Sequence, residues 1–75
     1  NGVLGLQRAF KKAGCKTIVM TLWKVNDRAT SLFMTTFYRN LFSGASKHDA
    51  FTAAQKAVRK EYEDPYYWAP FIMLD

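Results

Sequence analysis

The strongest constraint on the fold is the presence of only two strand-like runs, at residues 17–23 and 71–74. The first, Thr-Ile-Val-Met-Thr-Leu-Trp, is rich in β-branched residues and nearly continuously apolar. Such a run is typical of a strand buried on both faces inside an α/β sheet. The second, Phe-Ile-Met-Leu, predicts another short buried strand. Because a sheet needs roughly three or more strands to be stable alone, these two indicate an incomplete sheet.

Helical periodicity occupies the chain before the first run and directly after it. Apolar residues recur three and four positions apart over 2–13 and over 27–42, which predicts a helix in each range. Gly14 follows the first helix at the position where a left-handed residue is favoured. Asn26 and Asp27 are both good N-caps for the second. That helix carries a second apolar line, so we expect it to be sandwiched between layers: Met34, Tyr38 and Phe42.

A third helix is expected over 46–62, beginning with Ser46 and Asp49 in a capping arrangement and ending before Pro65. The predicted order is helix, strand, helix, helix, strand. Two antiparallel helices return the chain to the end of the sheet where the first strand finished. The last strand should therefore run antiparallel to the first. The fold class is α/β, and residues 1–75 form part of one domain.

The length and composition support this incompleteness. The 75 residues allow one domain at most, and 49% of them are apolar, which excludes a disordered chain. So much apolar surface is hard to bury in so small a unit, so we expect some of it to lie against another part of a larger protein. The chain begins at Asn1, and we interpret it as the C-terminal piece of a larger domain. No apolar run approaches the roughly 20 residues of a membrane span, and no signal peptide is evident.

The net charge of +5 does not by itself indicate nucleic-acid binding. Two basic groups fall on helical faces, which is the ordinary composition of a solvated surface helix. No zinc-finger spacing, RNP-like run or glycine clamp accompanies them, so nucleic acid ranks last among the expected partners. The two groups are Arg8, Lys11, Lys12 and Lys16, then Lys56, Arg59 and Lys60.

The chain carries no complete catalytic apparatus. Its one cysteine, Cys15, precedes the first strand and so faces the amino edge of the sheet, whereas nucleophiles of α/β proteins lie at the carboxyl edge. Its one histidine, His48, lies in the first turn of the third helix, so we do not expect a Cys15–His48 dyad. No metal-ligand spacing or phosphate loop is present, and we expect no cofactor. A single cysteine cannot form an internal disulfide, which suits the cytoplasm.

Three stretches together resemble the C-terminal half of a CHAT domain, a caspase-like peptidase module often fused to tetratricopeptide repeats. The first is Gly-Leu to Ala-Gly over 5–14, and the second is Leu-Trp-Lys-Val-Asn-Asp-Arg-Ala-Thr at 22–30. The third combines Ala-x-x-Ala-Ala-Gln at 50–55 with Pro-Tyr-Tyr-Trp-Ala-Pro-Phe at 65–71. Separase peptidases are similar across the second stretch. The resemblance covers nearly the whole chain.

The resemblance implies a caspase-like α/β sandwich whose catalytic histidine and cysteine both precede Asn1. In active members the segment after this strand helps form the specificity pocket. Asp27 matches the acidic position of that segment, and Trp23 would wall or support the same pocket. Two alternatives stay open, a helix cap for Asp27 and core packing for Trp23. Lys24 and Asn26 depart from the more acidic versions of this segment, so a preference for basic substrates does not follow.

The leading hypothesis is a non-catalytic C-terminal part of a caspase-like cysteine peptidase, or of an inactive relative, acting on a peptide or protein substrate. The alternative is a small self-associating interaction module without peptidase activity. Both predict homo-oligomers or strand exchange, because both leave apolar surface and sheet edges uncovered. They differ in the missing N-terminal part of the domain, where a His…Cys pair would favour the peptidase.

Overall fold

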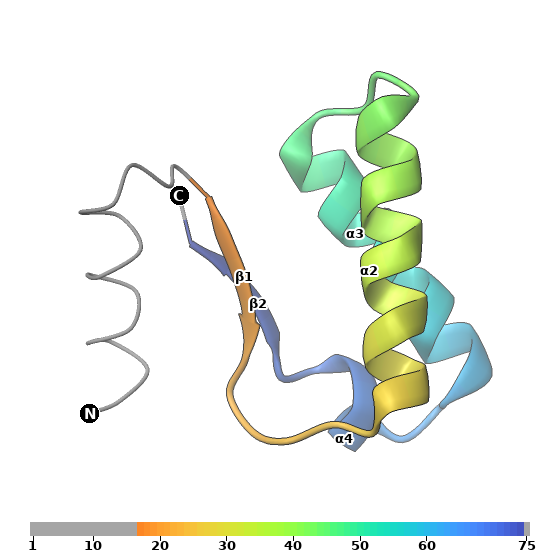
Figure 1. Cartoon of the computed structure of the whole chain (residues 1–75). Helices are drawn as coiled ribbons and strands as arrows, with labels where there is room; N and C mark the ends of the chain where they lie inside the picture. The colour runs from red at the N-terminus through yellow and green to blue at the C-terminus, as the bar shows by residue number, and fades with distance from the viewer. Residues whose placement is uncertain (1–16, 75) are drawn as a thin grey trace.

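The computed structural model describes residues 17–74, and Figure 1 shows their arrangement as a two-stranded sheet with two long helices on one face. In chain order the elements are β1 (Ile18–Thr21), α2 (Asp27–Phe42), α3 (Lys47–Glu61), α4 (Pro65–Trp68) and β2 (Phe71–Leu74). The helix predicted over 2–13 and Cys15 lie outside the described residues.

The two strands pair antiparallel, with Ile18 opposite Leu74 and Thr21 opposite Phe71. α2 and α3 run in opposite directions against the sheet, so the chain returns to the end where β1 finished (Figure 1). The predicted α/β class and the antiparallel last strand are confirmed. Because side chains alternate along a strand, each strand presents two residues to the helices and two to the other face. The first set is Val19, Thr21, Phe71 and Met73, and the second is Ile18, Met20, Ile72 and Leu74.

β1 is shorter than the predicted strand over 17–23. Its pairing ends at Thr21, and Leu22 and Trp23 are 54% and 41% exposed instead of buried. The cause is Pro70, which lies opposite Leu22 and has no N–H to return a hydrogen bond. The Leu22 amide still donates to the Pro70 carbonyl at 3.0 Å, but the ladder cannot continue beyond it.

α2 ends at a turn that only glycine makes without strain. Gly44 has φ of +99°, its amide donates to the Leu41 carbonyl at 3.1 Å, and the Ala45 amide donates to the Asn40 carbonyl at 3.0 Å. These two bonds satisfy carbonyls that the end of a helix otherwise leaves unpaired. The sharp reversal allows α3 to pack back along α2.

α3 begins as predicted, with the Ser46 hydroxyl accepting a hydrogen bond from the Asp49 amide at 3.1 Å. α4 was not predicted. The sequence Asp64-Pro65 stops α3, but it also starts a new turn: the Asp64 carboxylate accepts from the Tyr66 amide at 2.9 Å, and Pro65 occupies the first helical position. Proline is favoured there because that residue's N–H has no partner in any helix.

The core forms between α2, α3 and the helix-facing side of the sheet. Phe33 is fully buried at its centre and stacks on Phe71 with ring centroids 4.0 Å apart and planes 2° from parallel. The Phe51 ring packs edge-on against the Phe33 ring, with ring centroids 5.2 Å apart. Ala50 and Ala54 of α3 are fully buried, and their small side chains let the two helix backbones approach closely. The core cluster is Val25, Ala29, Phe33, Phe37, Ala50, Ala54, Val58 and Phe71.

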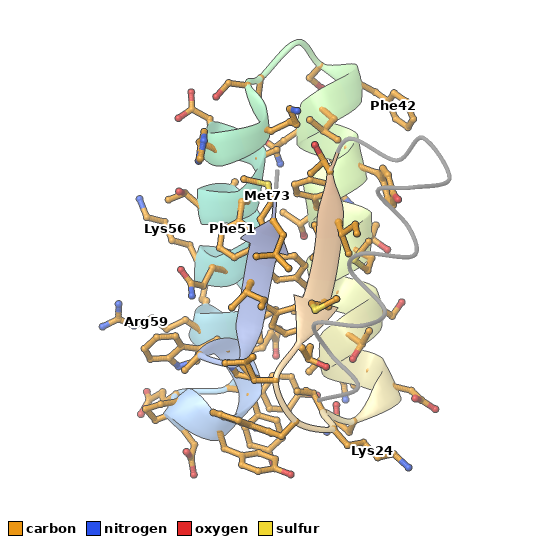
Figure 2. The ribbon with its side chains drawn as sticks, turned by 90° about the vertical axis from the view of Figure 1, so that its left-hand side faces the viewer. Lys24, Phe42, Phe51, Lys56, Arg59 and Met73 are labelled. Atoms are coloured by element: carbon orange, nitrogen blue, oxygen red, sulfur yellow. The ribbon has the colours of Figure 1, made fainter. Side chains whose placement is uncertain are left out.

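The second apolar line of α2 is not sandwiched, contrary to expectation. Met34 packs against the core, but Tyr38 is 49% exposed and Phe42 is 87% exposed. α3 and the sheet cover one side of α2, and among residues 17–74 nothing covers the end of its second line. Figure 2 shows Phe42 pointing away from the end of α2.

These exposures define a matched pair of substitutions. Phe33→Ala should lower the free energy of unfolding by about 3–5 kcal/mol, because it leaves a cavity and removes the stack on Phe71. Phe42→Ala deletes the same atoms from a solvated site on the same helix and should change that free energy by less than about 0.5 kcal/mol. Urea denaturation followed by circular dichroism measures both, and equal losses would contradict the position of the core.

Candidate functional site

The segment of residues 23–27, here called the 23–27 loop, leaves the carboxyl end of β1 and leads into α2. Its side chains are exposed except for Val25, which is 6% exposed and belongs to the core cluster. Val25 therefore holds the centre of the loop against the protein, while Trp23 and Lys24 on one side and Asn26 and Asp27 on the other face outward. Figure 2 shows Lys24 pointing away from the molecule at this end.

Asp27 is the first residue of α2, and its carboxylate is exposed. The cap of the helix is Asn26, whose side-chain oxygen accepts a hydrogen bond from the Ala29 amide at 2.8 Å. The interpretation of Asp27 as the cap is therefore wrong. Its negative charge favours the positive end of the helix dipole, but no hydrogen bond or ion pair within residues 17–74 engages its carboxylate. The group is available to an external partner.

Trp23 lies outside the core and is held by Tyr66 of α4. Its indole N–H donates to the Tyr66 backbone carbonyl at 2.9 Å, and the two rings lie 5.9 Å apart with planes tilted by 32°. The Tyr66 hydroxyl in turn donates to the Lys24 carbonyl at 3.0 Å. Core packing is therefore not the role of Trp23, whereas Trp68 does pack against the core cluster. Sequence analysis missed Tyr66, and the signal that places it was the cap-and-proline start of α4.

A shallow pocket of about 300 Å³ opens between the loop and α4. Its lining combines the two tyrosine rings with the buried side chain of Val25 and the polar side chains next to it: Lys24, Val25, Asn26, Tyr66 and Tyr67. Tyr66 and Tyr67 meet edge to face at 5.4 Å, which sets the angle between the two walls. Asp27 and Trp23 flank this lining along the chain. The arrangement suits binding of a small group rather than bond cleavage.

The chain's histidine is far from this loop. His48 lies in the first turn of α3, next to Lys47, whose amine donates to the Thr17 hydroxyl at 2.8 Å at the amino end of β1. The 23–27 loop leaves the opposite end of that strand (Figure 1). His48 and Asp27 are therefore not brought together. Cys15 lies outside the described residues, so the structure does not place the Cys15–His48 pair.

Three further properties of the described chain bear on function. No three of its histidine, cysteine or acidic side chains gather closely enough to bind a metal ion. Neither long helix within 17–74 has the length and hydrophobicity to cross a membrane. Of the second basic group, all three side chains are exposed, and Arg59 covers the Trp68 ring at 5.0 Å from its centroid. The first basic group, Arg8 to Lys16, lies outside the described residues.

Comparison with known proteins gives a consistent result. The model of the CHAT domain matches residues 1–75. Tetratricopeptide repeat protein 28 of Homo sapiens is 34% identical over 76 residues, and that of Mus musculus is 32% identical over the same length. Each alignment covers 99% of this chain but only 3% of the relative, so the chain corresponds to a small part of those proteins. No solved structure gives a significant match. On the match over its whole length, the chain belongs to the CHAT domain family.

Proposed function

We propose that this chain is the non-catalytic C-terminal part of a caspase-like cysteine peptidase domain, in which it supplies sheet core and a wall of the substrate pocket. The 23–27 loop is that wall. Trp23 provides an apolar surface beside the substrate, and Asp27 provides a carboxylate for a hydrogen bond or an ion pair. The nucleophile and its base belong to the part of the domain that precedes Asn1.

The observation that carries this proposal is the state of the 23–27 loop. The Trp23 ring stays 41% exposed, yet it is held in one orientation by a hydrogen bond and a ring contact from α4. Asp27 is exposed and unpaired within the described chain, although Lys24 and Arg28 lie close to it in sequence. A fixed apolar ring and an available carboxylate in one short loop are features of a ligand-binding surface.

The larger protein follows from the relatives. Both are named as tetratricopeptide repeat proteins, and we propose that this chain too belongs to a protein that carries such repeats. A location in the cytoplasm fits the single cysteine, which cannot form an internal disulfide.

Self-association is a second candidate, and the open edges of the sheet favour it. Since Leu22 and Pro70 form a hydrogen-bonded position, alternation makes 19/73 and 21/71 the positions whose backbone groups point outward. Within residues 17–74, Val19 and Thr21 then leave donors and acceptors unpaired along one edge, and Phe71 and Met73 do so along the other. A sheet edge of this kind pairs with another chain unless something covers it. Either a missing strand of the same domain or a second copy would satisfy these groups.

Asp27→Asn tests the pocket in the complete domain. A lost charge-assisted hydrogen bond weakens binding by about 1.5–3 kcal/mol, so kcat/KM for peptide hydrolysis should fall about ten- to hundredfold. Asp49→Asn is the matched control, because Asp49 is also exposed and lies in the first turn of α3, at the other end of the molecule. It should leave kcat/KM unchanged. Equal rates for Asp27→Asn and the unmodified domain would refute the role of Asp27.

The 75-residue chain alone should not hydrolyse peptides. It holds neither family catalytic position, and the sequence predicts no Cys15–His48 dyad, so Cys15 is expected to behave as an ordinary thiol. Incubation with a peptide-derived electrophile, followed by mass spectrometry, should give no selective modification of Cys15 relative to the denatured chain. Stoichiometric labelling of Cys15 together with peptide turnover would refute the proposal that the catalytic residues precede Asn1.

Pairing through the sheet edges should make the same chain an oligomer. Light scattering after size-exclusion chromatography, with serial dilution, should give a mass above that of the monomer, because the described residues of each copy leave backbone groups on both strands unpaired. A compact monodisperse monomer at low micromolar concentration contradicts self-association.

A further inference from the structure

Tyr66 contacts the 23–27 loop through both its backbone carbonyl and its side-chain hydroxyl. Its backbone carbonyl accepts from the Trp23 indole at 2.9 Å, and its hydroxyl donates to the Lys24 carbonyl at 3.0 Å. The two bonds run in opposite directions and engage neighbouring loop residues. They span 43 and 42 residues of sequence, so they connect two segments that are far apart along the chain. A loop held at two successive residues has little freedom to change its direction.

Tyr66 can act as a fixed support because α4 is itself anchored. The Asp64 carboxylate accepts from the Tyr66 amide at 2.9 Å, and the Trp68 indole donates to the Glu63 carbonyl at 3.1 Å. Tyr67 stacks on Tyr62 at the end of α3, with ring centroids 4.6 Å apart. α4 thus joins α3 on one side and leads into β2 on the other. The Trp23–Lys24 end of the loop is therefore positioned by α4, in addition to the core contact that Val25 makes.

The exposure of Tyr66 argues against a purely structural role. Its side chain is 51% exposed, and it is not among the residues that pack against the core cluster. Removing its hydroxyl leaves every core contact in place. It does remove the bond that fixes the Lys24 carbonyl, and Lys24 and Tyr66 both line the pocket of about 300 Å³.

We propose that Tyr66 is the positioning residue of this pocket: it latches the 23–27 loop to α4 and so determines which substrate side chains the pocket accepts. The inference rests on the proposed function, since the substrate is a peptide. The pocket accepts a side chain with an apolar or aromatic portion, because Val25 and the two tyrosines form most of its lining.

The latch itself is tested by nuclear magnetic resonance, independently of activity. In the complete domain, labelled with ¹⁵N-tryptophan and assigned with Trp23→Phe, hydrogen exchange of the Trp23 indole should be about two- to tenfold faster in Tyr66→Phe. The variant keeps the backbone carbonyl that the indole binds but loses the hydroxyl bond to the Lys24 carbonyl, so the loop separates from α4 more often. Tyr66→Ala should increase it further, since the ring contact is lost as well. Tyr38→Phe is the matched control: Tyr38 is 49% exposed, and its hydroxyl makes no hydrogen bond within residues 17–74. It should leave the exchange unchanged.

Peptide kinetics test the specificity. Tyr66→Phe should raise KM about threefold or more for peptides with an apolar or aromatic side chain at the cleavage site while kcat stays nearly constant, and the thermal midpoint should shift little. Unchanged indole exchange in both Tyr66 variants overturns the latch. A fall in kcat accompanied by a large drop in the thermal midpoint also overturns it, since that marks a global structural role. A domain that hydrolyses no peptide refutes the proposed function, and the exchange measurement then decides the latch alone.

Discussion

The stack between Phe33 and Phe71 is the contact on which the rest of this structure depends. It joins the middle of α2 to the first residue of β2, with both rings almost completely removed from water. Burying two such rings contributes roughly 1.5–3 kcal/mol each, a large share of the stability that a chain of this size has. Because Phe71 also pairs with Thr21, the stack sets the distance between the sheet and the helix layer. It thereby fixes where β2 begins.

The start of β2 then determines the geometry of the candidate site. Pro70 and α4 directly precede Phe71, so the position of Tyr66 follows from the core through a few residues of chain. Tyr66 in turn holds Trp23 and Lys24. The exposed end of the loop is consequently ordered by hydrogen bonds to backbone carbonyls, while Val25 and the aromatic stack fix the loop relative to the core. This division explains how side chains that remain exposed can still have one arrangement.

Sequence alone predicted those features that depend on neighbours along the chain. Apolar spacing predicted α2 and α3, and the Ser46 cap was correct because it depends on Asp49 three residues away. The failures involve contacts between distant residues. The length of β1 depends on the missing N–H of Pro70, and the partner of Trp23 is 43 residues away. No local pattern contains that information. Asp64 and Pro65 do carry a local signal for α4, but the same two residues also end α3, and the sequence predicted only that end.

A strand from the rest of the domain and a second copy of the chain would compete for the same backbone groups at the sheet edges. This competition limits how a peptidase domain can also self-associate. The described sheet has one outward-facing edge on β1 and one on β2. If both edges bind other copies, each copy joins two neighbours through different surfaces, and such heterologous contacts extend into open assemblies. If a strand of the complete domain covers one edge, a single edge remains, and two copies pair through it symmetrically and then stop. A closed dimer is therefore the form of self-association compatible with a peptidase domain, whereas an open assembly requires the rest of that domain to be absent from both edges.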